Sequence, residues 1–332
     1  MTATRRAESR KSSLAVVSDE FTRAVCQSDV SGVGSPAQSA RVRDHDCDLQ
    51  SRDCQDDCMS NEERVSITVS GGVADVRMNR ADKRNALDGA MFSALAAAGE
   101  RLKAEPAVRV VVLSGEGSSF CAGLDFGSFQ QMASGAAGMG SSDDSGNPGN
   151  MSPGRITHLG QQVSWVWQEI PVPVIAAVHG HALGGGIQIC LGADIRIVHP
   201  DTQMSVREIH WGLVPDMTGT MVLSRLVRPD VAKELTFTAR VFDGREALSL
   251  GLATKLSDDP RADALEMAHE IAGRSPDAVR GAKELFNRLA WSEAADQFAA
   301  ERRVIGSLIG RTNQVEAVMA NFEKRPPIFT DV

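Results

Sequence analysis

Two glycine-rich turns carry the most recognisable chemistry in this sequence. One spans residues 120–125 and the other residues 179–186, and each combines a strand-like run, a tight turn of small residues and the start of a helix. The first amides of a helix have no partner within it, and glycine lets a ligand approach the backbone closely, so such turns can hold an anion or an oxyanion. Two turns that face each other could hold one carbonyl oxygen. Alternatively, the glycines only permit tight turns and close helix packing.

Neither turn matches a nucleotide-binding fingerprint. A phosphate-binding loop would end in Gly-Lys-Ser or Gly-Lys-Thr, and a dinucleotide-binding fold would carry G-x-G-x-x-G after its first strand. Neither pattern stands in these turns. The sequence therefore argues against ATP and NAD as ligands.

Alternating strand and helix signals surround both turns. The spacing of apolar residues predicts strands over 73–78, 108–113, 174–178 and 194–198, and helices over 87–104 and 157–169. From Asp230 onwards the strand signals fade, and helices are predicted over 246–250, 262–272, 276–289 and 293–308. The pattern is typical of an α/β core followed by a helical C-terminal region. A segment over 135–154, rich in glycine, serine and aspartate, is expected either to cover the site or to be a plain insertion.

The composition excludes several classes of protein. The 332 residues are 42% hydrophobic and 23% charged, which is the balance of a globular protein rather than a disordered or fibrous chain. No apolar run approaches the roughly 18 residues of a membrane span. The formal net charge of −8 argues against general nucleic-acid binding, because phosphate neutralisation requires a basic surface. The N-terminus has no apolar leader, so we expect a cytoplasmic protein with reduced cysteines.

The first 58 residues differ in composition from the rest. They hold four of the six cysteines, an Asp-rich stretch and almost no apolar periodicity, so we expect a largely disordered extension. Thiolate and imidazole groups could bind zinc here, but their spacing fits no strong zinc pattern. These groups are His45, Cys47, Cys54 and Cys58. A further alternative is that the natural start is Met59, because alternating apolar residues begin directly after it.

Several short segments together resemble the enoyl-CoA hydratase/isomerase (crotonase) superfamily in order and spacing. They are Met78-Asn79-Arg80 with Asn85-Ala86-Leu87, Ser119-Phe120-Cys121-Ala122-Gly123-Leu124-Asp125, Ile175-Ala176-Ala177-Val178-His179-Gly180, Ala182-Leu183-Gly184-Gly185-Gly186 and Asp194-Ile195. The similarity runs from about Val65 to Phe329.

This resemblance implies a fold, a substrate and an assembly. After the extension at 1–62, residues 63–255 would form a crotonase-like spiral of ββα repeats with the CoA and acyl site. Residues 256–332 would form a C-terminal helical trimerisation region. The substrate would be an acyl-CoA thioester and the assembly a homotrimer or homohexamer. No metal or cofactor is implied, since CoA is part of the substrate.

The same resemblance assigns roles to residues in the two turns. The backbone amides of Leu124 and Gly185 would form an oxyanion hole for the thioester oxygen as it gains enolate charge. One preorganised donor of this kind contributes roughly 3 to 4 kcal/mol. Residues beside the first turn would cradle the CoA moiety, namely Lys83, Arg84, Ala86, Ala122, Gly123, Asp125 and Phe126. Lys83 and Arg84 would either pair with CoA phosphates or form a solvated edge.

Three polar residues occupy the acid–base positions of the family. Gln188 stands where a hydratase carries its first catalytic glutamate, and an amide can hold a water but cannot accept the proton. Glu208 matches the second catalytic glutamate. Asp216 stands where hydratases usually have glycine, which resembles the dienoyl-CoA isomerases. Alternatively, Glu208 is a surface carboxylate paired with Arg207, and Asp216 is a helix cap before Met217.

These matches predict an enzyme that isomerises the double bond of an enoyl-CoA or dienoyl-CoA through Glu208 and Asp216. One alternative is an enoyl-CoA hydratase in which Glu208 activates a water held by Gln188. Another is a noncatalytic acyl-CoA-binding scaffold. The other polar side chains near the site are expected to be structural, namely His179, His181, His210, Trp211, Cys121 and Cys190.

Overall fold

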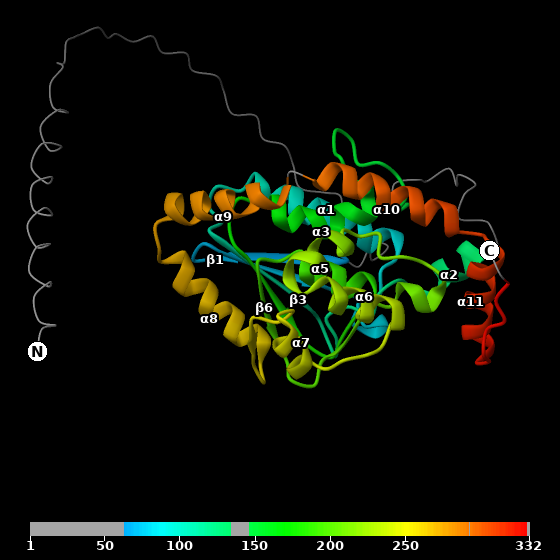
Figure 1. The fold of residues 1–332 in the computed structure, drawn as a ribbon. Coiled ribbons are helices and arrows are strands. Elements are labelled where there is room, and N and C mark those ends of the chain that lie inside the picture. The colour runs from blue at the N-terminus through cyan, green and yellow to red at the C-terminus, as the bar shows by residue number, and fades with distance from the viewer. Residues whose placement is uncertain (1–62, 134–145, 292, 331–332) are drawn as a thin grey trace, which may run out of the picture. The chain divides into compact units, whose positions relative to one another are not determined.

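The computed structural model describes residues 63–133, 146–291 and 293–330 (Figure 1). The predicted N-terminal extension, its candidate zinc ligands and residues 135–145 of the glycine-rich segment lie outside the described residues. The α/β architecture predicted from the sequence is confirmed. None of the described helices combines the length and apolar character needed to span a membrane.

A six-stranded sheet forms the centre of the described unit. Its spatial order is β1 (Val65–Ser70), β2 (Val73–Met78), β3 (Val110–Gly115), β4 (Val174–Val178), β6 (Ile195–Val198) and β8 (Lys255–Leu256). The β1–β2 pair is antiparallel, and the other neighbouring pairs are parallel. Strands β3 and β4 are buried along their whole length, which explains the continuous apolar runs at residues 110–113 and 174–178.

Helices cover both faces of this sheet (Figure 1). On one face, α1 (Gly89–Lys103) and α3 (Leu159–Glu169) contribute to the main core. On the other face, the buried alanines of α8 (Pro260–Ala272) pack against the strands. Successive residues of a strand therefore enter opposite cores, since Val111 lies in the main core whereas Val110 and Val112 face α8.

A second, two-stranded parallel sheet leads into the functional turns. Strands β5 (His181–Leu183) and β7 (Gln203–Ser205) pair so that Leu183 lies opposite Ser205. Helix α4 (Gly185–Leu191) follows β5 directly, and the 3-10 helix η3 (Glu208–Trp211) follows β7. Because the two strands are parallel, both helices begin at the same end of this small sheet.

The remaining helices agree with the sequence-based prediction only in part. They are η1 (Ala81–Lys83), α2 (Phe126–Ala133), α5 (Gly219–Leu226), α6 (Pro229–Thr238), α7 (Gly244–Leu250), α9 (Pro276–Trp291), α10 (Ala294–Leu308) and α11 (Thr312–Glu323). The four helices predicted after Asp230 correspond to α7, α8, α9 and α10. No range was predicted for helices η1, α2, α5, α6 and α11. Strand β8 was not predicted either, because it has two residues, too few to show a period. The helix predicted from Leu87 begins at Gly89, because Leu87 is extended and pairs with Leu124.

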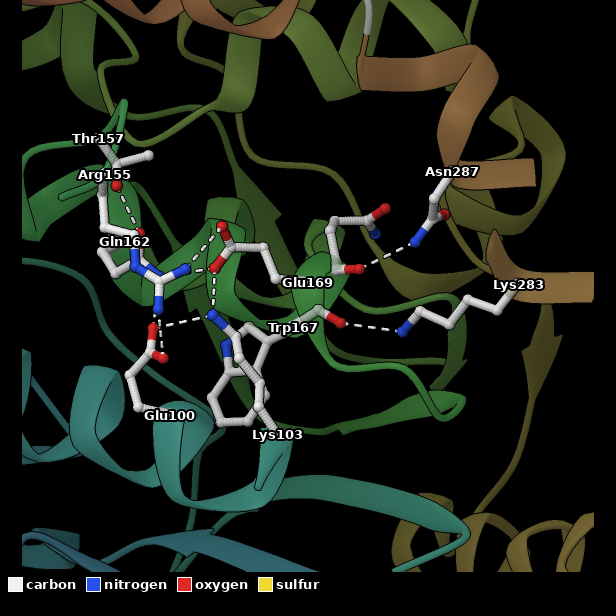
Figure 2. Close-up of polar contacts among 10 residues, drawn as sticks. Glu100, Lys103, Arg155, Thr157, Gln162, Trp167, Glu169, Lys283 and Asn287 are labelled. Carbon is white, nitrogen blue, oxygen red and sulfur yellow. Dashed lines mark hydrogen bonds and ion pairs between the residues drawn. The ribbon is translucent and has the colours of Figure 1, made fainter. Parts of the chain in front are cut away.

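Buried polar contacts hold α9 against the core (Figure 2). Lys283 Nζ donates to the carbonyl oxygens of Trp167 and Val172 at 3.0 and 2.9 Å. The same nitrogen pairs with Asp194 Oδ2 at 2.7 Å. Asn287, one helical turn later, donates to a carbonyl oxygen at the end of α3 at 2.9 Å. The C-terminal helices are thus anchored to the central sheet by an almost fully buried cation.

Four charged side chains join α1 to the end of α3 and to the segment that precedes α3 (Figure 2). Lys103 binds Glu100 at 2.8 Å and also pairs with Glu169. Arg155 pairs with the same two carboxylates, at 2.6 and 3.5 Å. Because two cations share two anions, the network holds the last residue of α3, Glu169, against α1.

Replacing the buried lysine is expected to destabilise the protein. Lys283→Met would leave Asp194 without its cation and two carbonyl oxygens without their donor, at a cost of about 2 to 4 kcal/mol. The measurement is the urea unfolding midpoint. The matched control is Lys255→Met, because Lys255 is half-exposed where it pairs with Asp263 and such surface pairs contribute about 1 kcal/mol or less. Equal losses in the two variants would contradict the anchoring role of Lys283.

Candidate active site

The two glycine turns lie against each other through their backbones. Cys121 N donates to His181 O at 2.9 Å, and Leu183 N donates to Cys121 O at 3.1 Å. A β-carbon on Gly123, whose φ is +91°, would lie 2.6 Å from Leu183 O. A β-carbon on Gly186 would lie 2.3 Å from Cys121 O. Only glycine therefore fits at these two positions, because the turns lie so close together. Close approach is expected whether the glycines form an oxyanion site or only permit tight packing.

The proposed oxyanion amides belong to Leu124 and Gly185. Their neighbours are engaged, since Asp125 N donates to Leu87 O at 3.0 Å and Gly184 N donates to Ser205 O at 2.9 Å. Among the residues that the structure describes, no backbone carbonyl accepts a hydrogen bond from Leu124 N or Gly185 N. Gly185 is also the first residue of α4, where helix amides have no internal partner. Two unengaged donors thus stand on facing turns, which is the arrangement that stabilises an oxyanion.

Glu208 is a buried carboxyl group beside the second turn. Its exposed fraction is 8%, and a β-carbon on Gly184 would lie 3.4 Å from its Oε1 atom. Burial raises the pKa of Glu208 to about 7, against the opposing effect of nearby hydrogen bonds. Oε2 is buried and has no hydrogen-bond partner among the described residues. A carboxyl group with one unengaged oxygen and a pKa near neutrality suits general acid–base catalysis.

Gln188 fixes the other oxygen of this carboxyl group. Its Nε2 donates to Glu208 Oε1 at 2.6 Å. Its Oε1 accepts hydrogen bonds from Met217 N at 2.9 Å and Gly219 N at 3.0 Å. Three of the four hydrogen bonds open to this amide are therefore made within the protein. Gln188 connects Glu208 to the turn that follows Asp216.

Asp216 lies in the connection between η3 and α5. Burial, followed by the carboxyl groups of Glu208 and Glu301, raises the pKa of Asp216 to about 8. Its Oδ2 atom lies 4.0 Å from Nε2 of His158. Burial lowers the pKa of His158 to about 4, so this imidazole is neutral near pH 7 and supplies no positive charge to Asp216. Asp216 thus differs from an ordinary surface aspartate in holding its proton near neutral pH.

The structural alternatives for the two carboxyl groups are wrong. Glu208 is not a surface carboxylate paired with Arg207, whose Nη1 instead donates to a backbone carbonyl at 3.0 Å. Asp216 is not the cap of the next helix, because α5 begins at Gly219 with Thr218 at its cap position and no side-chain capping bond. The two carboxyl groups are left available for chemistry.

Sequence reasoning missed two residues beside Asp216. His158 caps α3, where its Nδ1 accepts from Gln161 N at 3.0 Å. The sequence signal of a capping box has Ser or Thr at the cap position, so a histidine there gave no local signal. Glu301 lies on α10, far along the chain from Asp216, and no local pattern connects it to the site. Only the packing of α10 against this turn brings it there.

Comparison with known proteins places the chain in a family. The profile described as enoyl-CoA hydratase/isomerase matches residues 68–332. The chain belongs to the enoyl-CoA hydratase/isomerase family. As a family member it is an enzyme that acts on an acyl-CoA thioester.

Relatives in this family align with most of the length of this chain. It is 32% identical over 273 residues to methylglutaconyl-CoA hydratase, mitochondrial, of Mus musculus, covering 80% of each protein. It is 32% identical over 265 residues to short-chain-enoyl-CoA hydratase of Clostridium acetobutylicum, covering 79% of this chain and 95% of that relative. A solved structure of an enoyl-CoA hydratase/isomerase from Pseudoalteromonas atlantica has a TM-score of 0.70 at 27% identity, covering 80% of this chain and all (100%) of that one.

The residues predicted to bind CoA surround the first turn of the enzyme. Lys83 and Arg84 are exposed, which suits either a phosphate contact or a solvated edge. The first turn contains Ala122 and Gly123. Ala122 N donates to Arg84 O at 2.9 Å, which joins this turn to the segment that contains Ala86.

The side chains that follow Leu124 have different surroundings. The Asp125 carboxylate pairs with Arg80 at 2.7 Å and accepts from Gly127 N at 2.8 Å, so it stabilises the turn itself. Although burial opposes the shift, these partners hold the pKa of Asp125 below its usual range. Phe126 is 63% exposed and contacts the rings of Trp211 and Phe322. Its ring is thus available at the edge of the site.

The other polar side chains near the site have structural partners. Ser119 Oγ lies 2.9 Å from His181 Nδ1, and His179 Nε2 lies 2.9 Å from a backbone carbonyl oxygen. Cys121 and Cys190 are buried as predicted, and burial raises the pKa of each thiol to about 12. Neither thiol is therefore a nucleophile near neutral pH.

A β-carbon at the first turn is expected to abolish most turnover. Gly123→Ala would collide with Leu183 O and displace the neighbouring Leu124 amide, so kcat on a 2-enoyl-CoA or 3,5-dienoyl-CoA should fall by about 10² to 10³. The control is Gly310→Ala, which has a similar positive φ but no atom within 4 Å of the new β-carbon. Gly310→Ala should retain activity. Full activity in Gly123→Ala would rule out the assigned oxyanion hole.

Proposed function

We propose that this enzyme moves a double bond within an enoyl-CoA or dienoyl-CoA thioester, with Glu208 as the base and Asp216 as the acid. The observation that carries the proposal is a pair of carboxyl groups in one site, Glu208 buried and Asp216 partly buried, with the pKa of Asp216 at about 8 and that of Glu208 at about 7. Two such groups repel each other when both are ionised, so the pair retains one proton near neutral pH. One member can then accept a proton while the other donates one.

The reaction would proceed through an enolate held by the two glycine turns. The amides of Leu124 and Gly185 would bind the thioester oxygen. Oε2 of Glu208 would remove a proton from the acyl chain, and the C–H electron pair would pass into the conjugated system and onto that oxygen. Return of the electrons would form a bond between a more distant carbon and the proton of Asp216. The double bond has then migrated, Glu208 is protonated and Asp216 is ionised, and proton exchange with solvent restores the starting state.

The contacts of Gln188 support isomerisation over hydration. This amide donates to Glu208 and accepts from two backbone amides, so its side chain already serves to position the base and the Asp216 turn. It has no group that could accept a proton from water. An isomerase needs no nucleophilic water, and the remaining acid–base pair is sufficient for it.

Hydration of a 2-enoyl-CoA is the second candidate, and the names of the relatives favour it. Both curated relatives described above are named hydratases. In this case Glu208 alone would activate water, which Gln188 could contact through its one remaining N–H group. Asp216 would then have no direct part in the reaction.

Mass and absorbance separate these two reactions. Purified protein incubated with a 3,5-dienoyl-CoA should give an absorbance shift without a change in substrate mass. Glu208→Gln and Asp216→Asn should each lower this rate by about 10² or more, because general acid–base groups contribute 10² to 10⁴. With a 2-enoyl-CoA, a gain of one water that depends on Glu208 but not on Asp216 would instead establish a hydratase and reject the proposal.

The pH dependence of isomerisation should be bell-shaped and narrow. Activity requires ionised Glu208, so it rises as the pH passes the pKa of about 7. It also requires protonated Asp216, so it falls as the pH passes the pKa of about 8. The measurement is kcat/KM for the dienoyl-CoA between pH 5.5 and 9.5, in buffers of constant ionic strength. A rate that stays constant from pH 8 to 9.5 would contradict the role of Asp216 as the acid.

A further inference from the structure

The turn after Asp216 has an unusual backbone conformation. Thr218 is buried and has φ of +70°, in the left-handed region that favours glycine. Such a conformation persists only where the surroundings impose it. Gln188 holds the amides on either side, those of Met217 and Gly219. The Thr218 amide itself donates to Glu301 Oε2 at 3.1 Å.

Glu301 makes three hydrogen bonds from α10, all as the acceptor. Besides the Thr218 amide, its Oε2 accepts from Gln161 Nε2 at 3.0 Å, and its Oε1 accepts from Thr220 Oγ1 at 2.6 Å. Its exposed fraction is 4%. Burial raises the pKa of Glu301, and these hydrogen bonds oppose that effect because they favour the carboxylate form. A buried carboxyl group therefore holds the turn of Asp216 from the C-terminal side of the chain.

We propose that Glu301 is the positioning residue of Asp216, fixing the turn that carries this acid and, as a negative charge beside it, keeping it protonated. The inference rests on the proposed function, because it treats Asp216 as the acid. It adds a long-range requirement, since a residue of α10 would set the protonation of a group in the core unit.

Three titratable side chains face Asp216 in the described structure, one from each element packed around it. Glu208 comes from η3, Glu301 from α10 and His158 from the start of α3. Because Nδ1 of His158 accepts a backbone hydrogen bond, its proton is on Nε2, the nitrogen nearest Asp216. The nearby cation Arg302 binds the side chain of Gln161 at 2.9 Å and lowers the pKa of His158 further, after burial. After burial, the two carboxyl groups are therefore the main cause of the raised pKa of Asp216.

The test measures the alkaline limb of the pH–rate profile, which is the fall in rate at high pH, in variants that change the charge near Asp216. Glu301→Gln keeps the side-chain shape and removes the charge, so the limb should move to lower pH by on the order of one unit. Glu301→Asp keeps the charge and should leave the limb near its wild-type position, even where kcat falls. Thr220→Val removes one hydrogen bond to Glu301 without altering charge, and it too should leave the limb unchanged.

A second variant keeps the test available should Glu301→Gln fail to fold. Gln297 Nε2 donates to Thr220 Oγ1 at 2.6 Å on the half-buried side of this network. Gln297→Lys would bring a cation towards Glu301 while leaving Glu301 in place. The alkaline limb should again move to lower pH, and circular dichroism and thermal melting would verify folding of each variant.

The outcomes distinguish this inference from the proposed function. If wild-type protein isomerises the dienoyl-CoA but neither Glu301→Gln nor Gln297→Lys moves the limb, the positioning role is rejected and the proposed function stands. If the wild type only hydrates, the proposed function fails. The infrared band of the protonated Asp216 carboxyl group, identified by its loss in Asp216→Asn, still reports on Glu301. That band should titrate at lower pH in Glu301→Gln, and an unchanged titration would overturn the inference.

Discussion

The hydrogen bond from Gln188 to Glu208 is the interaction on which the site depends. A buried carboxyl group without a partner is costly, and this amide supplies one donor to one oxygen while leaving the other oxygen unengaged. Through its own oxygen, the same side chain holds the backbone on both sides of Thr218. The positions of Glu208 and Asp216 are thus coupled through one neutral residue. Loss of that residue would disturb both carboxyl groups at once.

Burial, and for Asp216 the neighbouring carboxyl groups as well, explains the raised pKa values of this pair. Asp216 is influenced by two other carboxyl groups, whereas the imidazole closest to it is neutral. When anions are gathered in a poorly solvated region without cations, the least costly state is one in which at least one of them is protonated. One of the carboxyl groups therefore keeps its proton near neutral pH, because the groups are poorly solvated and close together. Proton storage of this kind is a property of the group of side chains rather than of any single carboxyl group.

The sequence predicted the parts of the site that depend on short-range pattern. The closeness of the glycine turns followed from residues such as Gly123 and Gly186, because a tight approach demands a particular residue type. The spacing of apolar residues along each strand is also a short-range pattern, and the fold class was predicted from it. The partners of Asp216 could not be predicted, since Glu301 reaches it only through the packing of α10. The helix-cap interpretation of Asp216 failed because α5 begins three residues later, at Gly219, after a turn whose amides donate to Gln188 and Glu301.

The small β5–β7 sheet sets the spacing between the two segments that lead into the candidate site. Leu183 and Ser205 are directly paired, and the chain continues from them to the amide of Gly185 and to Glu208 respectively. Neighbouring strands lie about 4.8 Å apart, a spacing set by backbone hydrogen bonds and insensitive to side-chain identity. The backbone that leads to the Gly185 amide and the backbone that leads to Glu208 are therefore held at a spacing that the main chain sets. Substitutions of side chains around the proposed acyl site would leave this main-chain spacing in place, so a change of substrate would not require the proposed reactive groups to move.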